Sequence, residues 1–104
     1  MAIKAAFIFT SEGADPTIHH SENDTGNVNV CTFAVKNYAV ACDLAQQLIE
    51  QGFNAIELCG GFGSEGVAMV KKAVGGKIPV GVVRFDFHPG LNFSSGDDVF
   101  LSAE

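Results

Sequence analysis

The chain has 104 residues, of which 47% are hydrophobic and 17% are charged, and its formal net charge is −6. A chain of this length forms one core, so we expect a single domain over residues 1–104. The six basic residues are dispersed along the chain, which disfavours nucleic acid as a partner. Nine phenylalanines and few charges are more than one small core needs, so self-association as a homo-oligomer is expected.

Export and membrane signals are weak. The apolar run at residues 5–9 is shorter than the roughly 7 to 15 residues of a signal-peptide core. No stretch approaches the roughly 20 apolar residues that span a bilayer, so we expect a cytoplasmic protein with no membrane partner. Cys31, Cys42 and Cys59 lack C-x-x-C spacing and predict neither a disulfide framework nor a zinc finger.

The N-terminal segment, "IKAAFIF" at residues 3–9, is rich in Ile and Phe and predicts a strand. A long polar connection follows it. Asp15 followed by Pro16 has the form of a helix cap with proline at the first helical position. The pattern therefore predicts a short helix over about residues 15–22.

The next two elements are a strand and a helix. Residues 28–36, "VNVCTFAVK", are β-branched and aromatic and predict the second strand. Asn37 is placed to cap a helix that begins at Tyr38, because its side chain can accept a free backbone N–H. Gly52 stands where the residue after the helix adopts the left-handed conformation.

Two further strands enclose a second helix. Residues 55–59 predict a short strand, and residues 64–74 predict a helix capped by Ser64. The near-continuous apolar run at residues 80–87 is typical of a buried parallel strand. The turn-rich segment at residues 89–104 predicts a C-terminal tail or an extra edge strand.

Strands that alternate with helices at this spacing indicate βαβ units. We therefore predict an α/β fold: a small, mainly parallel sheet of about four strands with helices packed on its faces. The direction of the strand that follows the first connection stays open, because that connection can return antiparallel.

Five segments together resemble an uncharacterised family of small bacterial and archaeal proteins, catalogued as a domain of unknown function. They are "KAAFIF", "GADP", "IELCGGFG", "VGGKIPVGVVRFD" and "HPG". The resemblance covers residues 2 to about 91 and implies one cytoplasmic α/β domain. It carries no catalytic residue across.

The carboxyl ends of parallel strands leave a crevice where ligands commonly bind. A glycine loop at residues 60–64 follows the third strand and opens a helix, whose N-terminus favours an anion. The loop lacks both the dinucleotide pattern and the P-loop pattern, so a tight turn is the alternative interpretation. The predicted ligand-binding residues are Gly60, Gly61, Phe62, Gly63, Ser64, Arg84 and Asp86.

Charged residues also interrupt the predicted strands. Glu57 and Arg84 lie on segments that helices should cover, where an unpaired charge is costly, so we predict a structural ion pair between them. A ligand carboxylate or phosphate held by Arg84 is the alternative.

Cys59 stands beside a helix N-terminus that can lower a thiol pKa, and His88 ends the next strand as a candidate base. A buried cysteine that acts as a small hydrophobe is the other interpretation. Because the histidine spacing matches no metal motif, no metal site is predicted.

These residues favour an oligomeric domain that binds a small anionic or carbonyl-bearing ligand at the strand ends. One alternative is a small enzyme of isomerase, lyase or hydrolase type that uses Cys59 and His88 with Asp86 and Glu57. The other is a structural oligomeric subunit without a ligand. The sequence identifies no cofactor.

Overall fold

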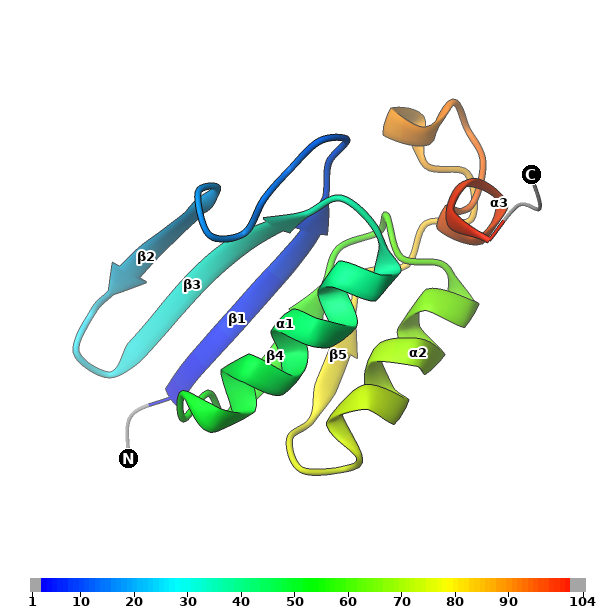
Figure 1. Ribbon diagram of the computed structural model, residues 1–104. Helices are drawn as coiled ribbons and strands as arrows, with labels where there is room; N and C mark the ends of the chain where they lie inside the picture. The colour runs from blue at the N-terminus through cyan, green and yellow to red at the C-terminus, as the bar shows by residue number, and fades with distance from the viewer. Residues whose placement is uncertain (1–2, 102–104) are drawn as a thin grey trace.

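The protein forms one five-stranded sheet with helices on one side (Figure 1). The structure is a computed structural model and describes residues 3–101. The strand order is β2-β3-β1-β4-β5. The strands are β1 (Ile3–Thr10), β2 (His20–Asp24), β3 (Val28–Val35), β4 (Ala55–Leu58) and β5 (Val80–Val82).

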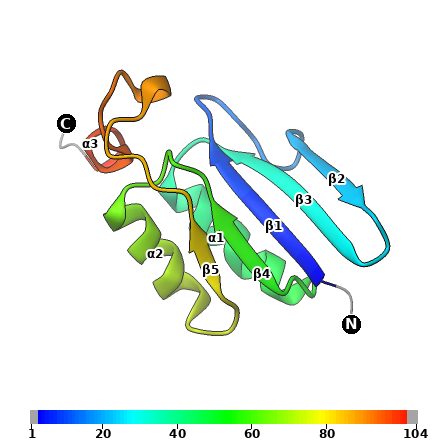
Figure 2. The ribbon, with the colours of Figure 1, turned by 180° about the vertical axis from the view of Figure 1, so that it is seen from behind.

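Two long helices cover a single face of this sheet. Helix α1 (Tyr38–Glu50) connects β3 to β4 past β1, and α2 (Ser64–Val74) connects β4 to β5. Seen from behind in Figure 2, the sheet stands in front of α1, and α2 lies beside β5. The predicted arrangement of helices on both faces is therefore corrected, since the second face carries no helix within residues 3–101.

The core lies between the helices and the sheet. Ala6 and Ile8 of β1 are almost fully buried there, against Ala41, Ala45 and Leu48 of α1. Their spacing follows the period of two in a strand and of about 3.6 in a helix, so each element turns one side toward the core.

The predicted start and end of α1 are confirmed. The Asn37 side chain accepts a hydrogen bond from the Val40 N–H at 2.9 Å, as a helix cap does. At the other end Gly52 has φ of +87°, in the left-handed region that glycine adopts without strain. The cap of α2 differs from the prediction, because Gly63 precedes the helix and Ser64 is its first residue.

The first connection holds a strand in place of the predicted helix. β2 runs antiparallel to β3, while β3 itself runs parallel to β1, which settles the direction that the sequence left open. An Asp15–Thr17 turn, with the Asp15 carboxylate accepting the Thr17 N–H at 2.9 Å, ends without continuing into a helix. The strand at residues 20–24 is polar and fully exposed, so hydrophobic periodicity gave no signal for it.

The C-terminal third also departs from the predicted pattern. β5 ends at Val82, so the apolar run continues as irregular chain rather than as a buried strand. The tail forms the short helix η1 (Pro89–Leu91) and the helix α3 (Gly96–Phe100) instead of an edge strand, and residues 102–104 lie outside the described part. No helix within residues 3–101 is long and apolar enough to cross a membrane.

Candidate functional site

The parallel strands β3, β1, β4 and β5 end at one edge of the sheet, where η1 and α3 also lie (Figure 1). Two hollows open at this edge. The first, of about 300 Å³, lies between the start of α2, the segment after β5 and the start of α3. The second, of about 580 Å³, lies between the ends of β1 and β3 and the C-terminal segment. Thr10 and Ser11 after β1, Lys36 after β3, and Gly90 of η1 meet in the second hollow.

The glycine loop is packed tightly against other parts of the same chain. A Cβ at Gly60 would overlap the Phe85 ring, and one at Gly61 would overlap the Thr10 hydroxyl. At Gly63, a Cβ would overlap the Asp97 carboxylate. These glycines therefore allow a close approach, and the groups that approach them belong to the chain itself.

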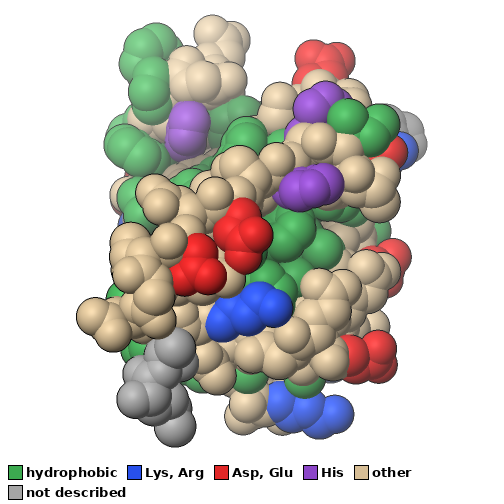
Figure 3. All heavy atoms as spheres, turned by 90° about the vertical axis from the view of Figure 1, so that its left-hand side faces the viewer, with side chains coloured by type: hydrophobic (Ala, Val, Ile, Leu, Met, Phe, Trp, Pro, Cys, Tyr) green, Lys and Arg blue, Asp and Glu red, His purple; other side chains and the backbone are tan. Residues whose placement is uncertain are grey.

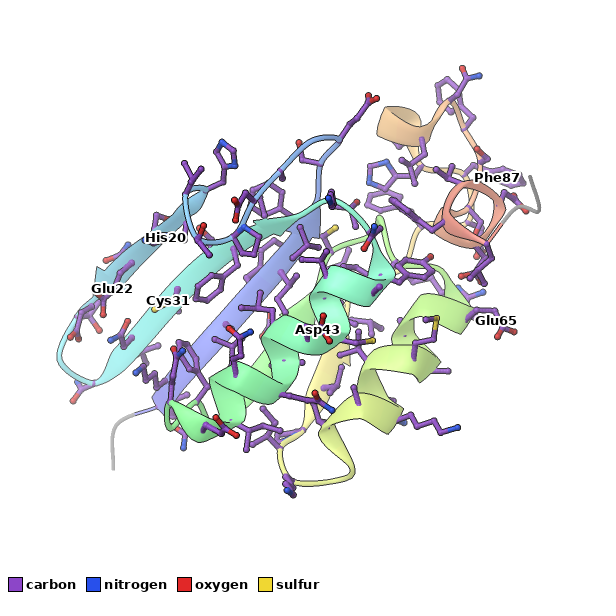
Figure 4. The ribbon with its side chains drawn as sticks, in the orientation of Figure 1. His20, Glu22, Cys31, Asp43, Glu65 and Phe87 are labelled. Carbon is purple, nitrogen blue, oxygen red and sulfur yellow. The ribbon has the colours of Figure 1, made fainter. Side chains whose placement is uncertain are left out.

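The positive end of α2 already holds an anion. The Asp97 carboxylate of α3 accepts the backbone N–H of Glu65 at 2.9 Å and that of Gly66 at 3.2 Å. Because the first N–H groups of a helix lack partners within it, a carboxylate there satisfies both their hydrogen bonds and the helix dipole. In Figure 4 the Glu65 side chain points outward from this turn, so Asp97 alone supplies the carboxylate.

Tyr38 joins the loop to α3. Its hydroxyl donates to the Asp97 carboxylate at 3.0 Å and accepts the Gly63 N–H at 3.0 Å. The ring stacks on Phe62 with centroids 5.4 Å apart and lies 4.8 Å from the Phe100 ring. Burial is the main cause that raises the pKa of Tyr38 well above its ordinary value, and the bond to Asp97 acts in the same direction.

Two more loop N–H groups donate within the chain. Gly61 N–H donates to the Cys59 sulfur at 3.2 Å, and Phe62 N–H donates to the Cys59 carbonyl at 3.1 Å. An oxygen of a ligand would therefore have to displace an internal acceptor to reach them. The first hollow borders this loop through Phe62, Gly63 and Ser64.

The predicted ion pair between Glu57 and Arg84 is corrected. Arg84 pairs instead with Asp86, with its Nη2 atom 3.0 Å from the carboxylate, and both side chains are about two-thirds exposed. Glu57 is exposed on the sheet face that no described helix covers. Glu57 needs no buried partner because that face carries no helix within residues 3–101, and Arg84 needs none because it lies in the exposed segment after β5.

Cys59 and His88 are not joined by a hydrogen bond in the described part of the chain. The Cys59 sulfur accepts the Gly61 N–H, while His88 Nδ1 accepts the Gly90 N–H at 3.0 Å. The His88 ring packs edge-on against Phe85, with centroids 5.0 Å apart. Their role as a nucleophile and base stays a prediction. Among residues 3–101, no group of three or more His, Cys, Asp or Glu side chains could hold a metal ion.

Tyr38 and Asp97 are the site residues that sequence reasoning missed. Tyr38 is the single tyrosine of the chain and was noted only as the start of a helix. Asp97 lies 31 residues from Gly66 along the chain. No local sequence pattern predicts that a residue so distant will cap a helix. The "SSGDD" segment did hold one usable signal: a Ser followed three residues later by an acid is typical of a capping box, which Ser95 and Asp98 form.

Comparison with known proteins identifies the family. A family model described as a family of unknown function (DUF6506) matches residues 3–98. No curated protein and no solved structure matches the chain. The matched range includes every residue that lines the first hollow, as well as the glycine loop, Tyr38 and Asp97. The chain therefore belongs to the family of unknown function DUF6506.

Proposed function

We propose that the protein binds a small molecule in the first hollow, at the carboxyl edge of the sheet. The observation that carries this proposal is an exposed apolar segment bordering a cavity of about 300 Å³. Four apolar side chains flank Arg84, the single arginine of the chain, and each is between 44% and 75% exposed: Val82, Val83, Phe85 and Phe87. Clustered exposed apolar side chains beside a few polar groups are typical of ligand sites, whose volumes begin near ~300 Å³.

The lining favours a ligand with an apolar body and a carbonyl or carboxylate oxygen. Phe62, Val67 and Val82 provide apolar walls, while Ser64 and Ser95 bring hydroxyl groups that can donate to an oxygen. Phe87 lies at the same edge beside α3 (Figure 4). The molecule would enter between the α2 start and the segment after β5.

Arg84 is the group that would hold the ligand oxygen. Its pair with Asp86 is exposed, and exposed pairs contribute only about 0 to 1 kcal/mol, so the guanidinium can turn to a ligand at small cost. Asp97 also lines the hollow but is satisfied by α2 and Tyr38. With Asp86 and Asp97 nearby, a single carboxylate or a neutral carbonyl suits the site better than a phosphate with more charge.

The test compares two charge variants with the same chemical change. Arg84→Gln removes the proposed oxygen donor, and Lys77→Gln removes an exposed charge at the opposite end of β5. Benzoate and benzamide serve as probes. Their binding is measured by NMR from changes in the chemical shifts of the protein's backbone amides. We expect both probes to shift the amides of residues 62–64 and 82–86, and Arg84→Gln to weaken benzoate binding at least tenfold.

Lys77→Gln should leave the binding of both probes unchanged. Benzoate shifts that survive Arg84→Gln, or shifts confined to the second hollow, would contradict the proposed site. No shift with either probe would contradict the proposed ligand chemistry. The enzyme alternative has no observation of its own in its favour, because Cys59 and His88 bond to different partners.

A further inference from the structure

One face of the sheet is bare and apolar. Strand residues alternate between faces, so Ala6 and Ile8 point into the core and their neighbours point the other way. We call this second surface the open face. Its apolar side chains include Ile3, Ala5 and Phe7 of β1, Val28 and Val30 of β3, and Ala55 of β4, and strand pairing places Thr32 and Glu57 on it as well. Ile3, Val28 and Val30 are 48%, 40% and 37% exposed.

The rest of the described chain leaves the open face uncovered. The connection at residues 11–19 reaches only the far end of the sheet, where Ala14, Ala34 and Phe9 border a small hollow. Both long helices pack on the opposite side (Figures 1 and 2). Antiparallel sheets often leave one face to water, but parallel strands are usually covered on both faces.

We propose that the open face is covered by the same face of a second copy of this chain, in a symmetric sheet-on-sheet dimer. The five strands are three to eight residues long, and at ~3.3 Å per residue and a spacing of ~4.8 Å the whole sheet has a planar footprint of roughly 450 Å². Two such faces bury on the order of 1,000 Å² before side-chain relief is counted, close to the lower limit for a specific dimer.

The charge pattern selects a second copy over a charged partner. The chain carries a net charge of −6, yet Glu57 is the one charged side chain on β1, β3 or β4 that points to this face. A charged partner protein would therefore find almost no opposite charge on the open face with which to form ion pairs. Identical chains repel each other where their charges meet, so they associate best through a face that lacks them.

Symmetry also gives Glu57 a partner. In the sheet, Phe7 pairs with Thr32 on one side and with Glu57 on the other, and Ser21 lies beyond Thr32. A two-fold axis along β1, between the two sheets, places Glu57 of each copy opposite Thr32 and Ser21 of the other. The Ser21 and Thr32 hydroxyls hydrogen-bond each other at 2.6 Å, which leaves one hydroxyl hydrogen of the pair to donate to the Glu57 carboxylate of the other copy.

Edge-to-edge association is the competing arrangement, and the edges disfavour it. His20, Glu22 and Asp24 lie on β2, and all of this strand is exposed. Figure 3, which views the molecule from this side, shows acidic and histidine side chains over the edge. Charges on an edge strand discourage pairing with another chain, and the opposite edge, β5, has only three residues. The faces therefore offer the better contact.

Sedimentation velocity tests the proposal with two variants of matched exposure. Val30 on the open face is 37% exposed, and Met69 on α2 is 38% exposed. We expect the unaltered protein and Met69→Glu to sediment with the mass of two chains at micromolar concentrations. Val30→Glu should sediment as one chain, with at least a hundredfold weaker association and an unchanged circular dichroism spectrum.

A single-chain mass for the unaltered protein would overturn the proposal. So would a dimer that survives Val30→Glu, or one that Met69→Glu dissociates. If Val30→Glu unfolds, Ile3→Lys at the start of β1 replaces it, since Ile3 is more exposed and contributes nothing to the core. A single-chain mass for Ile3→Lys then supports the proposed dimer, and a two-chain mass contradicts it.

Discussion

Asp97 connects the C-terminal helix to the centre of the domain, and Asp97→Ala measures that connection. The substitution leaves the N–H groups of Glu65 and Gly66 without their acceptor, at a cost of about 1 kcal/mol for a lost helix cap. Loss of a half-buried negative charge at the helix N-terminus adds up to about 1 kcal/mol. Tyr38 also loses its bond to a charged acceptor, which costs about 1.5 to 3 kcal/mol.

The first two effects overlap, so we expect Asp97→Ala to reduce the free energy of unfolding by about 2 to 4 kcal/mol. Native domains are stable by about 5 to 15 kcal/mol, so the variant should still fold. Urea unfolding followed by circular dichroism checks this. With a slope of about 1.5 kcal/mol/M, the midpoint should fall by between about 1 and 3 M.

Asp98→Ala is the matched control, because Asp98 is the adjacent acid of the same helix. Its carboxylate accepts only the local Ser95 N–H, at 3.3 Å, so its loss should cost about 0.5 to 1 kcal/mol. A loss at Asp97 within about 0.5 kcal/mol of the loss at Asp98 would refute the view that α3 is anchored through this carboxylate.

Two further predictions concern the same junction. The raised pKa of Tyr38 means that the folded chain keeps this proton where an unfolded chain, with an ordinary value of 10.0, releases it, so stability should fall as the pH rises above about 10. The chain has one tyrosine and no tryptophan, so tyrosinate absorbance reports Tyr38 directly, and a folded-state midpoint near 10.0 would contradict the prediction. Gly61→Ala should destabilise the fold by about 1 to 3 kcal/mol through its clash with Thr10, whereas Gly81→Ala, whose Cβ would meet only the Glu57 side chain at an ordinary 3.8 Å, should be neutral or slightly stabilising in thermal melts. Equal effects at the two glycines would mean that the loop is looser than it appears.

Most of the helical part of the fold follows from local sequence. Asn37 and Gly52 bound α1 because a side-chain acceptor and a left-handed backbone are requirements of the helix ends themselves. The apolar run at residues 3–9 predicts β1 in a similarly local way, since Ile and Phe favour strands. Such signals act over a few residues and need no knowledge of the rest of the chain.

β2 is an element that local sequence signals did not predict. All five of its residues are exposed, so no apolar period marks it, and its strand conformation comes from pairing with β3. Whether the segment after β5 is buried depends on how many helix layers cover the sheet, and local sequence does not give that number. A near-continuous apolar run predicts a strand covered on both faces, but Val83 and Phe85 lie beyond β5 and are exposed.

The candidate site divides in the same way. By itself the sequence determined that a glycine loop precedes a helix at the carboxyl edge of the sheet, because strand, glycines and helix are neighbours along the chain. Only the tertiary structure decided what the glycines approach. Asp97 and Tyr38 come to the loop from 34 and 25 residues away from Gly63, and contacts at such separations depend on how the whole chain packs rather than on any local preference.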